Sequence, residues 1–509
     1  MKIYSLKSYQ QALDEAGLLT DYRIADDNYD AVEHITYNSK DIRPLTLFVC
    51  KGAAFRKDYL DEAIAAGCCC YVSETKYVTA DHVSFLIVSN VRKAMALIAN
   101  MFFDNAWEKL RLIGITGTKG KSTTAYYIKY ILDEYLQTVG EKPSAIVSSI
   151  DVYDGRELEE AHLTTPEAFE LHRHFDNAVQ SGIRYLEMEV SSQALKYDRV
   201  EGITFDAGVF LNISEDHISP VEHSDFEDYF SAKLKLFGQS KLAVVNLNSD
   251  YRDRILEAAK ASPALITFGL YEEADVCGYD VKKEGGEIHF KVRTADFDEE
   301  FALTMPGLFN VENALAAIAV CRHYGIPVEQ IRTGLYKARS KGRMEIFEND
   351  DSSIIAIVDY AHNKLSFEKL YESVREEYAG RRIITVFGCP GGKAYNRREE
   401  LAELAGRYSD RVYLTMEDPG PEEVGEISRA IQKNLNNPDC ESFLIDDRGE
   451  AIRAAILDAP SGSIVLITGK GSETRQKIGS AYVPCKPDAY FAKQALEAAG
   501  ETILEKQIN

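Results

Sequence analysis

The sequence lacks an excess of basic charge. Its 58 Lys and Arg residues face 81 Asp and Glu residues, which leaves a formal net charge of −23. Surfaces that bind nucleic acid or anionic membranes need a basic face that displaces counterions. We therefore expect neither a nucleic-acid nor a membrane partner, although a few local cations can still hold a small anionic substrate.

Long apolar runs are also missing. Runs such as Ile464 to Thr468 are far shorter than the roughly 20 residues that a membrane-spanning helix needs, and the start, MKIYSLKSYQ, has no apolar stretch like that of a signal peptide. These absences predict a cytoplasmic protein, which we expect to act as a monomer.

The nine cysteines form no C-x-x-C pair and no Cys/His spacing suited to zinc. Cys68, Cys69 and Cys70 are consecutive and lead into an apolar segment. Because a free cysteine commonly packs as a small apolar side chain, we predict that these three enter a buried strand.

Hydrophobic residues make up 45% and charged residues 27% of the chain, a composition typical of globular proteins. Short apolar runs alternate with helix-length amphipathic segments, which predicts an α/β fold with mainly parallel sheets. An alternating stretch at 279–293 with a central Gly-Gly pair predicts a hairpin. We expect three consecutive domains, at residues 1–105, 106–338 and 339–509.

The segment 114–124, GITGTKGKSTT, lies between a predicted strand and a predicted helix. It misses the strict phosphate-loop pattern because Ile115 stands where the first glycine is required. Its glycines can still turn backbone N–H groups toward a phosphate at a helix N-terminus. In this interpretation Lys121 neutralises phosphates and Ser122 ligates Mg²⁺; the alternative is a simple turn that caps the helix.

Candidate metal ligands follow two later apolar runs. Glu187 and Glu189 end one of them, where ligands bind in parallel α/β sheets. His217 follows Asp216 after another, and a carboxylate and an imidazole can both hold a divalent cation. Taken alone, His217 fits a structural histidine better, and Lys233 fits a solvated helix lysine.

Taken together, these motifs resemble those of the Mur ligases. GTKGKSTT, EVSSQAL, NISEDH, SAKLKLF, GLFNVEN, KGRME and VDYAH follow in that family's order. The stretches LTTP, VFGC and GKGSE make the chain most similar to the UDP-N-acetylmuramoyl-tripeptide synthetases, and the matches extend from about residue 38 to residue 476.

The resemblance implies an N-terminal domain for the UDP-sugar, a central P-loop ATPase and a C-terminal Rossmann-like domain for the amino acid. ATP would phosphorylate the D-glutamate γ-carboxylate of UDP-MurNAc-L-Ala-D-Glu, and an amine would then displace phosphate. Carboxylate and γ-phosphate are both anionic, so cations must bring them together. ATP and Mg²⁺ are the implied cofactors.

The resemblance also assigns residues. ATP would be held by Gly117, Thr118, Lys119, Gly120, Lys121, Ser122, Thr123, Asn310, Arg343 and Asp359. Mg²⁺ would be held by Ser122, Glu189, His217 and Lys233, the last of these carbamylated; Lys121, Glu189, His217, Lys233 and Arg343 would form the catalytic set. UDP-MurNAc-dipeptide would contact Ser39, Thr164, Thr165, Ser191 and Arg199, and the amino acid would contact Lys393, Glu417, Asp418, Gly469 and Glu473.

Departures from the family pattern predict the amino acid. Relatives that add diaminopimelate carry D-N-P-R, whereas residues 417–420 here are Glu-Asp-Pro-Gly. Without the arginine, the guanidinium fork that suits a distal carboxylate is lost. Because Glu417 and Asp418 would attract a distal ammonium, we expect L-lysine or another basic diamino acid such as ornithine. The alternative is that the two acids only begin a turn.

Two other functions remain open from the sequence. One is a related amide ligase with another acceptor, such as a folylpolyglutamate synthetase, although LTTP and GKGSE fit that group poorly. The other is a nucleotide-dependent switch that hydrolyses ATP without forming a bond. A panel of amino acids supplied with ATP and the UDP-dipeptide distinguishes them.

Overall fold

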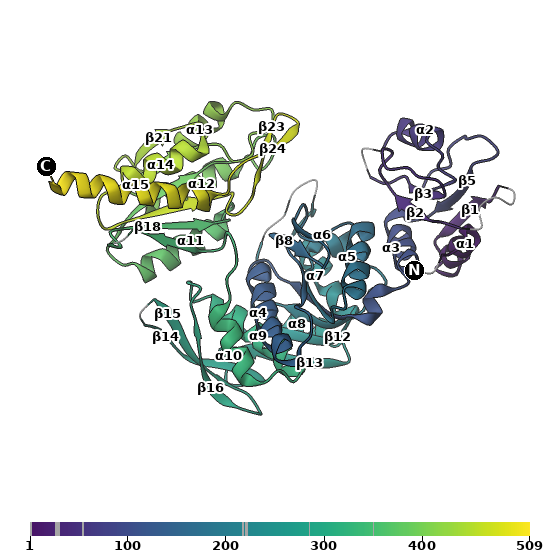
Figure 1. Ribbon diagram of the computed structural model, residues 1–509, viewed down its shortest axis with the longest axis horizontal. Coiled ribbons are helices and arrows are strands. Elements are labelled where there is room, and N and C mark those ends of the chain that lie inside the picture. Colours follow the sequence, from purple (N-terminus) through teal and green to yellow (C-terminus); the bar gives the residue numbers. More distant parts are fainter. Residues whose placement is uncertain are drawn as a thin grey trace. The chain divides into compact units, whose positions relative to one another are not determined.

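The computed structural model describes residues 3–25, 31–52, 55–215, 218, 222–284, 286–349 and 351–508, with side chains to residue 499. The chain forms two compact units (Figure 1). The first comprises Met1–Val281, His289–Ala302 and Val311–Lys337, and the second comprises Lys282–Ile288, Leu303–Asn310 and Ala338–Asn509. Three main sheets in the described residues, each with its own buried core, confirm the predicted α/β class with three lobes.

The N-terminal lobe is a five-stranded sheet in the order β1-β5-β4-β3-β2, in which only β1 runs antiparallel to its neighbour. Helices α1 and α3 cover one face and α2 covers the other. Cys68, Cys69 and Cys70 are buried in this lobe, as predicted. The elements are α1 Leu6–Glu15, β1 Leu19–Arg23, β2 His34–Thr36, β3 Thr46–Val49, α2 Lys57–Ala65, β4 Cys70–Ser73, β5 Ser84–Val88 and α3 Val91–Phe102.

The middle lobe is built on an eleven-stranded sheet in the order β16-β15-β14-β13-β12-β11-β6-β10-β7-β8-β9. Its strands are β6 Arg111–Thr116, β7 Ala145–Val147, β8 Asp151–Tyr153, β9 Leu158–Glu160, β10 Tyr185–Glu189, β11 Phe205–Phe210, β12 Ser240–Asn246, β13 Ala264–Gly269, β14 Val276–Glu284, β15 Glu287–Arg293 and β16 Asp298–Leu303. Its helices are η1 Ala106–Lys109, α4 Lys121–Val139, α5 Ala168–Gln180, α6 Ser192–Lys196, α7 Phe226–Gly238, α8 Arg252–Ala259, α9 Asn310–His323 and α10 Val328–Lys337.

The position of β6 in this sheet fixes where a ligand can bind. Strand β6 lies between β10 and β11 and runs parallel to both. In the register, Glu189 pairs with Ile115 and Phe210 pairs with Thr116, so the three strands end at the same edge. Because β6 has a parallel neighbour on each side, the crevice in which α/β sheets bind ligands lies at its carboxyl end.

The C-terminal lobe is a six-stranded sheet in the order β17-β18-β22-β19-β20-β21, in which only β17 is antiparallel. Helices α11, α12 and α13 cover one face, and α14 and α15 cover the other. The elements are β17 Glu345–Glu348, β18 Ile354–Asp359, α11 Lys364–Glu377, β19 Arg382–Phe387, α12 Arg397–Tyr408, β20 Arg411–Leu414, α13 Val424–Gln432, β21 Glu441–Leu444, α14 Arg448–Leu457, β22 Ser463–Thr468, β23 Arg475–Ile478, β24 Ala481–Pro484 and α15 Asp488–Ile508.

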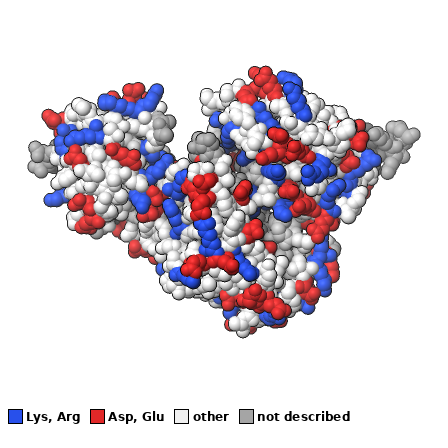
Figure 2. Space-filling model, turned by 180° about the vertical axis from the view of Figure 1, so that it is seen from behind, with Lys and Arg blue, Asp and Glu red and all other residues white. Residues whose placement is uncertain are grey.

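The surface mixes charges of both signs. On the face shown in Figure 2, Lys and Arg alternate with Asp and Glu and form no continuous basic area. Among the described residues, no helix is both long enough and apolar enough to cross a membrane.

Candidate active site

The predicted phosphate loop is the turn from β6 into α4. Gly120 precedes the helix with φ +86°, a backbone conformation that glycine adopts without strain. A Cβ atom there would lie only 2.2 Å from Asn313 Oδ1. The N–H of Thr118 donates to the Asn212 carbonyl (3.0 Å), and the N–H of Lys119 donates to the Asn212 side chain (2.9 Å). The turn therefore favours glycine at position 120 and is tied to the segment after β11.

Two lysines point at this loop. Lys121, the first residue of α4, donates from Nζ to the carbonyls of Gly117 (2.9 Å) and Thr118 (3.2 Å). Lys233 of α7 is 2% exposed and also donates to the Gly117 carbonyl, at 2.9 Å. The amino groups of Lys121 and Lys233 thus lie against the turn that is predicted to bind the triphosphate.

Two of the predicted metal ligands, Ser122 and Glu189, lie beside the same turn. Ser122 Oγ is 3.1 Å from Ser149 Oγ, and the N–H of Ser149 donates to Glu189 Oε1 at 2.8 Å. A hydroxyl and a carboxylate are the hard oxygen donors that Mg²⁺ prefers, so this pair fits the ion. His217 lies outside the described residues.

Glu187 faces a different environment from Glu189, although the two were predicted at one edge. Its carboxyl is fully buried, Ser144 Oγ donates to Oε1 at 2.9 Å, and Oε2 has no hydrogen-bond partner in the described structure. Burial raises the pKa of Glu187 to about 8. This carboxyl belongs to the core of the middle lobe.

A further group of potential metal ligands is formed by Asp154, Glu157 and His174. Asp154 already accepts four hydrogen bonds, from the N–H groups of Arg156 and Glu157 and from the side chains of His174 and Asn177. These contacts fix the turn between β8 and β9 onto α5, so the group acts as a structural anchor.

Three of the predicted sugar-peptide residues meet next to Glu189. Thr165 Oγ1 donates to the Glu189 carbonyl at 2.9 Å and accepts from the N–H of Ser191 at 3.0 Å. Arg199 Nη1 donates to the Thr165 carbonyl at 3.0 Å. Thr164 is the neighbouring residue in the chain, half-buried. Ser39 is engaged elsewhere, since its hydroxyl donates to Glu62 at 2.9 Å.

The same cluster includes residues that the sequence analysis missed. Glu167 Oε2 is 2.7 Å from Lys51 Nζ, and its Oε1 is 2.9 Å from Arg199 Nη2. Lys51 lies just after the carboxyl end of β3, and Glu167 directly follows the LTTP stretch. Position at a strand's carboxyl end and adjacency to a motif are the signals that could have identified them.

In the second unit, the predicted nucleotide residues lie at or near loop ends. Asp359 ends β18 and accepts from the N–H groups of Met344 (2.9 Å) and Ala361 (2.7 Å). The Arg343 guanidinium lies 4.6 Å from the centre of the Tyr360 ring. Asn310 begins α9, is 2% exposed and donates to the Pro306 carbonyl at 2.6 Å. Asp359 and Asn310 are thus held by backbone groups of their own unit, and Arg343 lies against an aromatic ring of that unit.

Four of the predicted amino-acid residues are brought together by the loops after β20 and β22. Lys470, which sequence analysis missed although it lies within GKGSE, joins them: its Nζ is 3.0 Å from Asp418 Oδ1 and forms an ion pair with Glu473. Gly469 lies against Glu417, because a Cβ atom on the glycine would be 3.4 Å from Glu417 Oε2. Lys393 lies exposed on another loop, and no described hydrogen bond or ion pair links it to this group.

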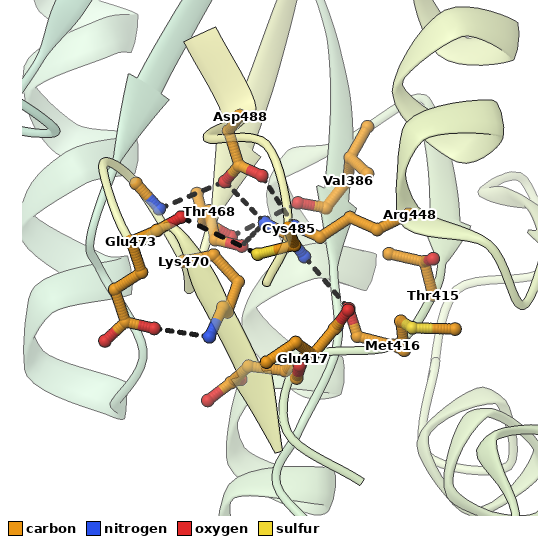
Figure 3. A network of polar contacts seen from close by, with 12 residues as sticks. Val386, Thr415, Met416, Glu417, Arg448, Thr468, Lys470, Glu473, Cys485 and Asp488 are labelled. Atoms are coloured by element: carbon orange, nitrogen blue, oxygen red, sulfur yellow. Dashed lines mark hydrogen bonds and ion pairs between the residues drawn. The ribbon is translucent and has the colours of Figure 1, made fainter. Parts of the chain in front are cut away.

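A buried ion pair supports these loops (Figure 3). Arg448, at the start of α14, makes two contacts of 2.7 Å with Asp488. It also donates to the carbonyls of Met416 (3.2 Å) and Thr468 (2.8 Å), and Asp488 accepts from the N–H of Gly471 at 3.0 Å. The pair therefore fixes the ends of β20 and β22 at the start of α15.

Glu417 is the unusual carboxyl of this group. Its side chain is buried, Oε2 accepts no hydrogen bond, and burial raises its pKa to about 7. Asp418, in contrast, accepts from Lys470 and from the N–H of Lys477 (3.0 Å). The prediction treated the two acids alike, but they differ in burial: Asp418 is partly exposed and receives both hydrogen bonds at Oδ1, whereas Glu417 has a buried oxygen without a hydrogen-bond partner in the described structure.

Two protein-family models and several known proteins match the chain. The sequence matches the Mur ligase middle domain over residues 115–321 and the Mur ligase glutamate ligase domain over residues 342–471. It is 36% identical to the UDP-N-acetylmuramyl-tripeptide synthetase of Lactobacillus delbrueckii subsp. bulgaricus, over 97% of this chain and 99% of that protein.

Relatives named for two different amino acids are similar to the chain. One is the UDP-N-acetylmuramoyl-L-alanyl-D-glutamate–L-lysine ligase of Streptococcus agalactiae, 39% identical over 91% of this chain and 92% of that one. Another is the corresponding 2,6-diaminopimelate ligase of Caldanaerobacter subterraneus subsp. tengcongensis, 36% identical over 89% and 92%. A solved 2,6-diaminopimelate ligase shares the fold with a TM-score of 0.65 at 22% identity, covering 98% of this chain and 99% of its own.

Proposed function

This chain belongs to the Mur ligase family of ATP-dependent ligases, and we propose that it adds L-lysine, or another basic diamino acid, to UDP-N-acetylmuramoyl-L-alanyl-D-glutamate. One observation carries the proposal. A continuous series of contacts runs from the phosphate loop through Ser122, Ser149, Glu189 and Thr165 to Arg199. The residues that the resemblance assigns to the phosphates and to the sugar-peptide thus lie at a single edge of the middle sheet.

The family resemblance implies the reaction. The γ-carboxylate of D-glutamate attacks the γ-phosphorus of ATP, the bond to the β-phosphate oxygen breaks, and ADP leaves. The amino group then attacks the acyl phosphate carbon, loses a proton and expels inorganic phosphate, which leaves an amide. Lys121 and the loop N–H groups stabilise charge on the transferred phosphoryl group.

Mg²⁺ fits the oxygen donors of Ser122 and Glu189, to which we add His217 and a carbamylated Lys233 from the family resemblance. When bound, the ion neutralises phosphate charge. Carbamylation would give Lys233 an anionic end in place of an ammonium. For the nucleotide, we assign Asn310, Arg343 and Asp359 as further contacts.

Selectivity for a basic amino acid is supported by the charges around Glu417. Three nearby cations act on Glu417, namely Arg397, Arg448 and Lys470. Of these, Arg448 is paired with Asp488, and Lys470 is paired with Asp418 and Glu473. Glu417 Oε2 accepts no hydrogen bond from the described residues. A distal ammonium would give this oxygen a partner, whereas a distal carboxylate would bring a second negative charge to it.

One assay tests the proposal. Purified protein is incubated with ATP, Mg²⁺, the UDP-dipeptide and a panel of amino acids, and the molecular masses of the products are measured. We expect an amide product with L-lysine or ornithine. Product with diaminopimelate alone would overturn the selectivity, and ATP hydrolysis without any amide product would favour the nucleotide-dependent switch.

A further inference from the structure

Three cations and two carboxylates meet between the N-terminal and middle lobes of the first unit. We call this group the seam cluster; it comprises Lys51, Arg92, Glu167, Glu170 and Arg199. The side chains of Lys51, Glu167 and Arg199 are only 12%, 15% and 9% exposed. One carboxylate, that of Glu167, binds a cation from each lobe, with a separate oxygen for each.

The charges of the seam cluster do not cancel. Glu167 pairs with both Lys51 and Arg199, while Glu170 accepts from the hydroxyl of Tyr37 at 2.7 Å. Arg92 has no ion pair with any described residue, and its guanidinium lies 4.4 Å from the centre of the Tyr197 ring. Three positive charges therefore face two negative ones in a half-buried place.

Arg199 in this cluster retains a donor that nothing satisfies. Its Nε is buried and has no hydrogen-bond partner in the described structure. Burial alone would raise the pKa of Glu167, but Arg199, Lys51 and Arg92 outweigh it and hold that pKa below its usual value. Glu167 therefore stays ionised and acts as the resident counter-ion of a site that can accept another anion.

The seam cluster is joined to the proposed sugar-peptide site. Arg199 donates to the Thr165 carbonyl, and Thr165 in turn contacts Glu189 and Ser191. The terminal D-glutamate of the proposed precursor carries two carboxylates. One reacts with ATP, while the other remains anionic and needs a cation throughout the reaction.

We propose that Lys51 binds the non-reacting carboxylate of the precursor's terminal residue, and that Glu167 occupies this cation when the precursor is absent. This inference rests on the proposed function. Binding replaces one carboxylate partner of Lys51 with another, so the lysine stays paired in both states. Lys51 of the N-terminal lobe then binds one carboxylate of the terminal residue, while the other carboxylate of that residue reacts in the middle lobe.

The test measures steady-state kinetics of Lys51→Met. We expect the KM for the UDP-dipeptide to rise about 10- to 100-fold, the loss expected for one charge-assisted hydrogen bond. The KM for ATP should stay unchanged, and Lys51→Arg should recover most of the affinity. Lys76→Met is the matched control, because Lys76 forms an exposed ion pair with Asp21 in the same lobe (2.8 Å). Unchanged KM in Lys51→Met would overturn the inference.

A double-mutant cycle distinguishes direct contact between Lys51 and the precursor from an indirect effect of Lys51 through Glu167. If Lys51 contacts the precursor, Lys51→Met should still raise the KM in a Glu167→Gln background. Loss of the effect there would mean that Lys51 acts only through Glu167, which contradicts the inference. Wild-type protein that forms no amide at all would refute the proposed function instead.

A modified precursor identifies the anion. With the non-reacting carboxyl converted to an amide, we expect wild type and Lys51→Met to show nearly equal KM values. A difference that persists with this precursor would place the diphosphate, and not the carboxylate, at Lys51, and would overturn the assignment. Thermal melts of each variant verify that the protein is folded.

Discussion

Lys233 donates a hydrogen bond of 2.9 Å to the carbonyl of Gly117, although 116 positions separate the two residues. The contact links α7 to the phosphate loop across the carboxyl edge of the middle sheet. It places a buried amine 2.9 Å from the carbonyl of the loop's first glycine, where the family resemblance implies a carbamate.

Lys233→Ala should lower kcat by a factor on the order of 10² to 10³, because the site loses a charged group beside the phosphates. If the carbamate's negative charge is the functional feature, added acetate should restore part of the rate. The rate is measured as phosphate release with and without acetate. Lys235→Ala, an exposed lysine of the same helix, is the control. Absence of any acetate effect would indicate that the ammonium itself is required.

Lys121→Ala should abolish turnover, because the transferring phosphoryl group loses its main protein cation. Binding of the UDP-dipeptide should change little, since Thr165 and Arg199 do not contact this lysine in the described structure. Phosphate release and calorimetric titration with the UDP-dipeptide measure the two effects separately. Turnover near the wild-type rate would contradict the assignment of the phosphate loop.

Use of L-lysine should improve as pH rises through about 7, because burial raises the pKa of Glu417 to about 7 and only its ionised form attracts an ammonium. We expect the KM for L-lysine to fall between about pH 6 and about pH 8 and then level off. Glu417→Gln should raise this KM by about 10-fold or more and remove its pH dependence. A KM that follows the same pH curve in the variant would show that another group titrates.

Asp418→Asn is compared with Glu417→Gln to decide which of the two carboxylates selects the amino acid. Asp418 already pairs with Lys470 and accepts from the N–H of Lys477, so its loss should mainly loosen the loop. We expect a lower melting temperature with little change in the preference for L-lysine over diaminopimelate. A reversed preference in Asp418→Asn would show that this carboxylate, and not Glu417, selects the amino acid.

Glu187→Gln should make the protein more stable at alkaline pH. Burial raises the pKa of Glu187 to about 8, well above the usual value for a glutamate, so between these two values the folded state keeps a proton that the unfolded state has lost. The free energy of unfolding therefore falls as pH rises across that range. The neutral amide removes this contribution, and urea melts at about pH 6 and about pH 8.5 should show a flatter dependence. An identical slope in both proteins would mean that Glu187 is ionised in the fold.

Local elements could be predicted from the sequence because their signals are local. The apolar run and glycines around 111–120 predicted a strand, a turn and a helix, and the structure has β6, the phosphate loop and α4. The hairpin predicted at 279–293 is formed by β14 and β15. Glu187 escaped this reasoning, because strand alternation alone does not tell whether a carboxyl faces a crevice or a packed helix.

The sequence by itself determined the α/β class, the glycine-rich turn before α4 and the family, since each depends on residue types at fixed spacing. Only the tertiary structure decided which charges are paired. It joined Lys51 to Glu167 and Arg199, and Asp418 to Lys470, leaving Glu417 with an oxygen that accepts no hydrogen bond. Such pairings depend on parallel strands ending at a shared edge, which brings residues far apart in the chain within a few ångströms of each other, and charges interact over distance in space rather than along the sequence.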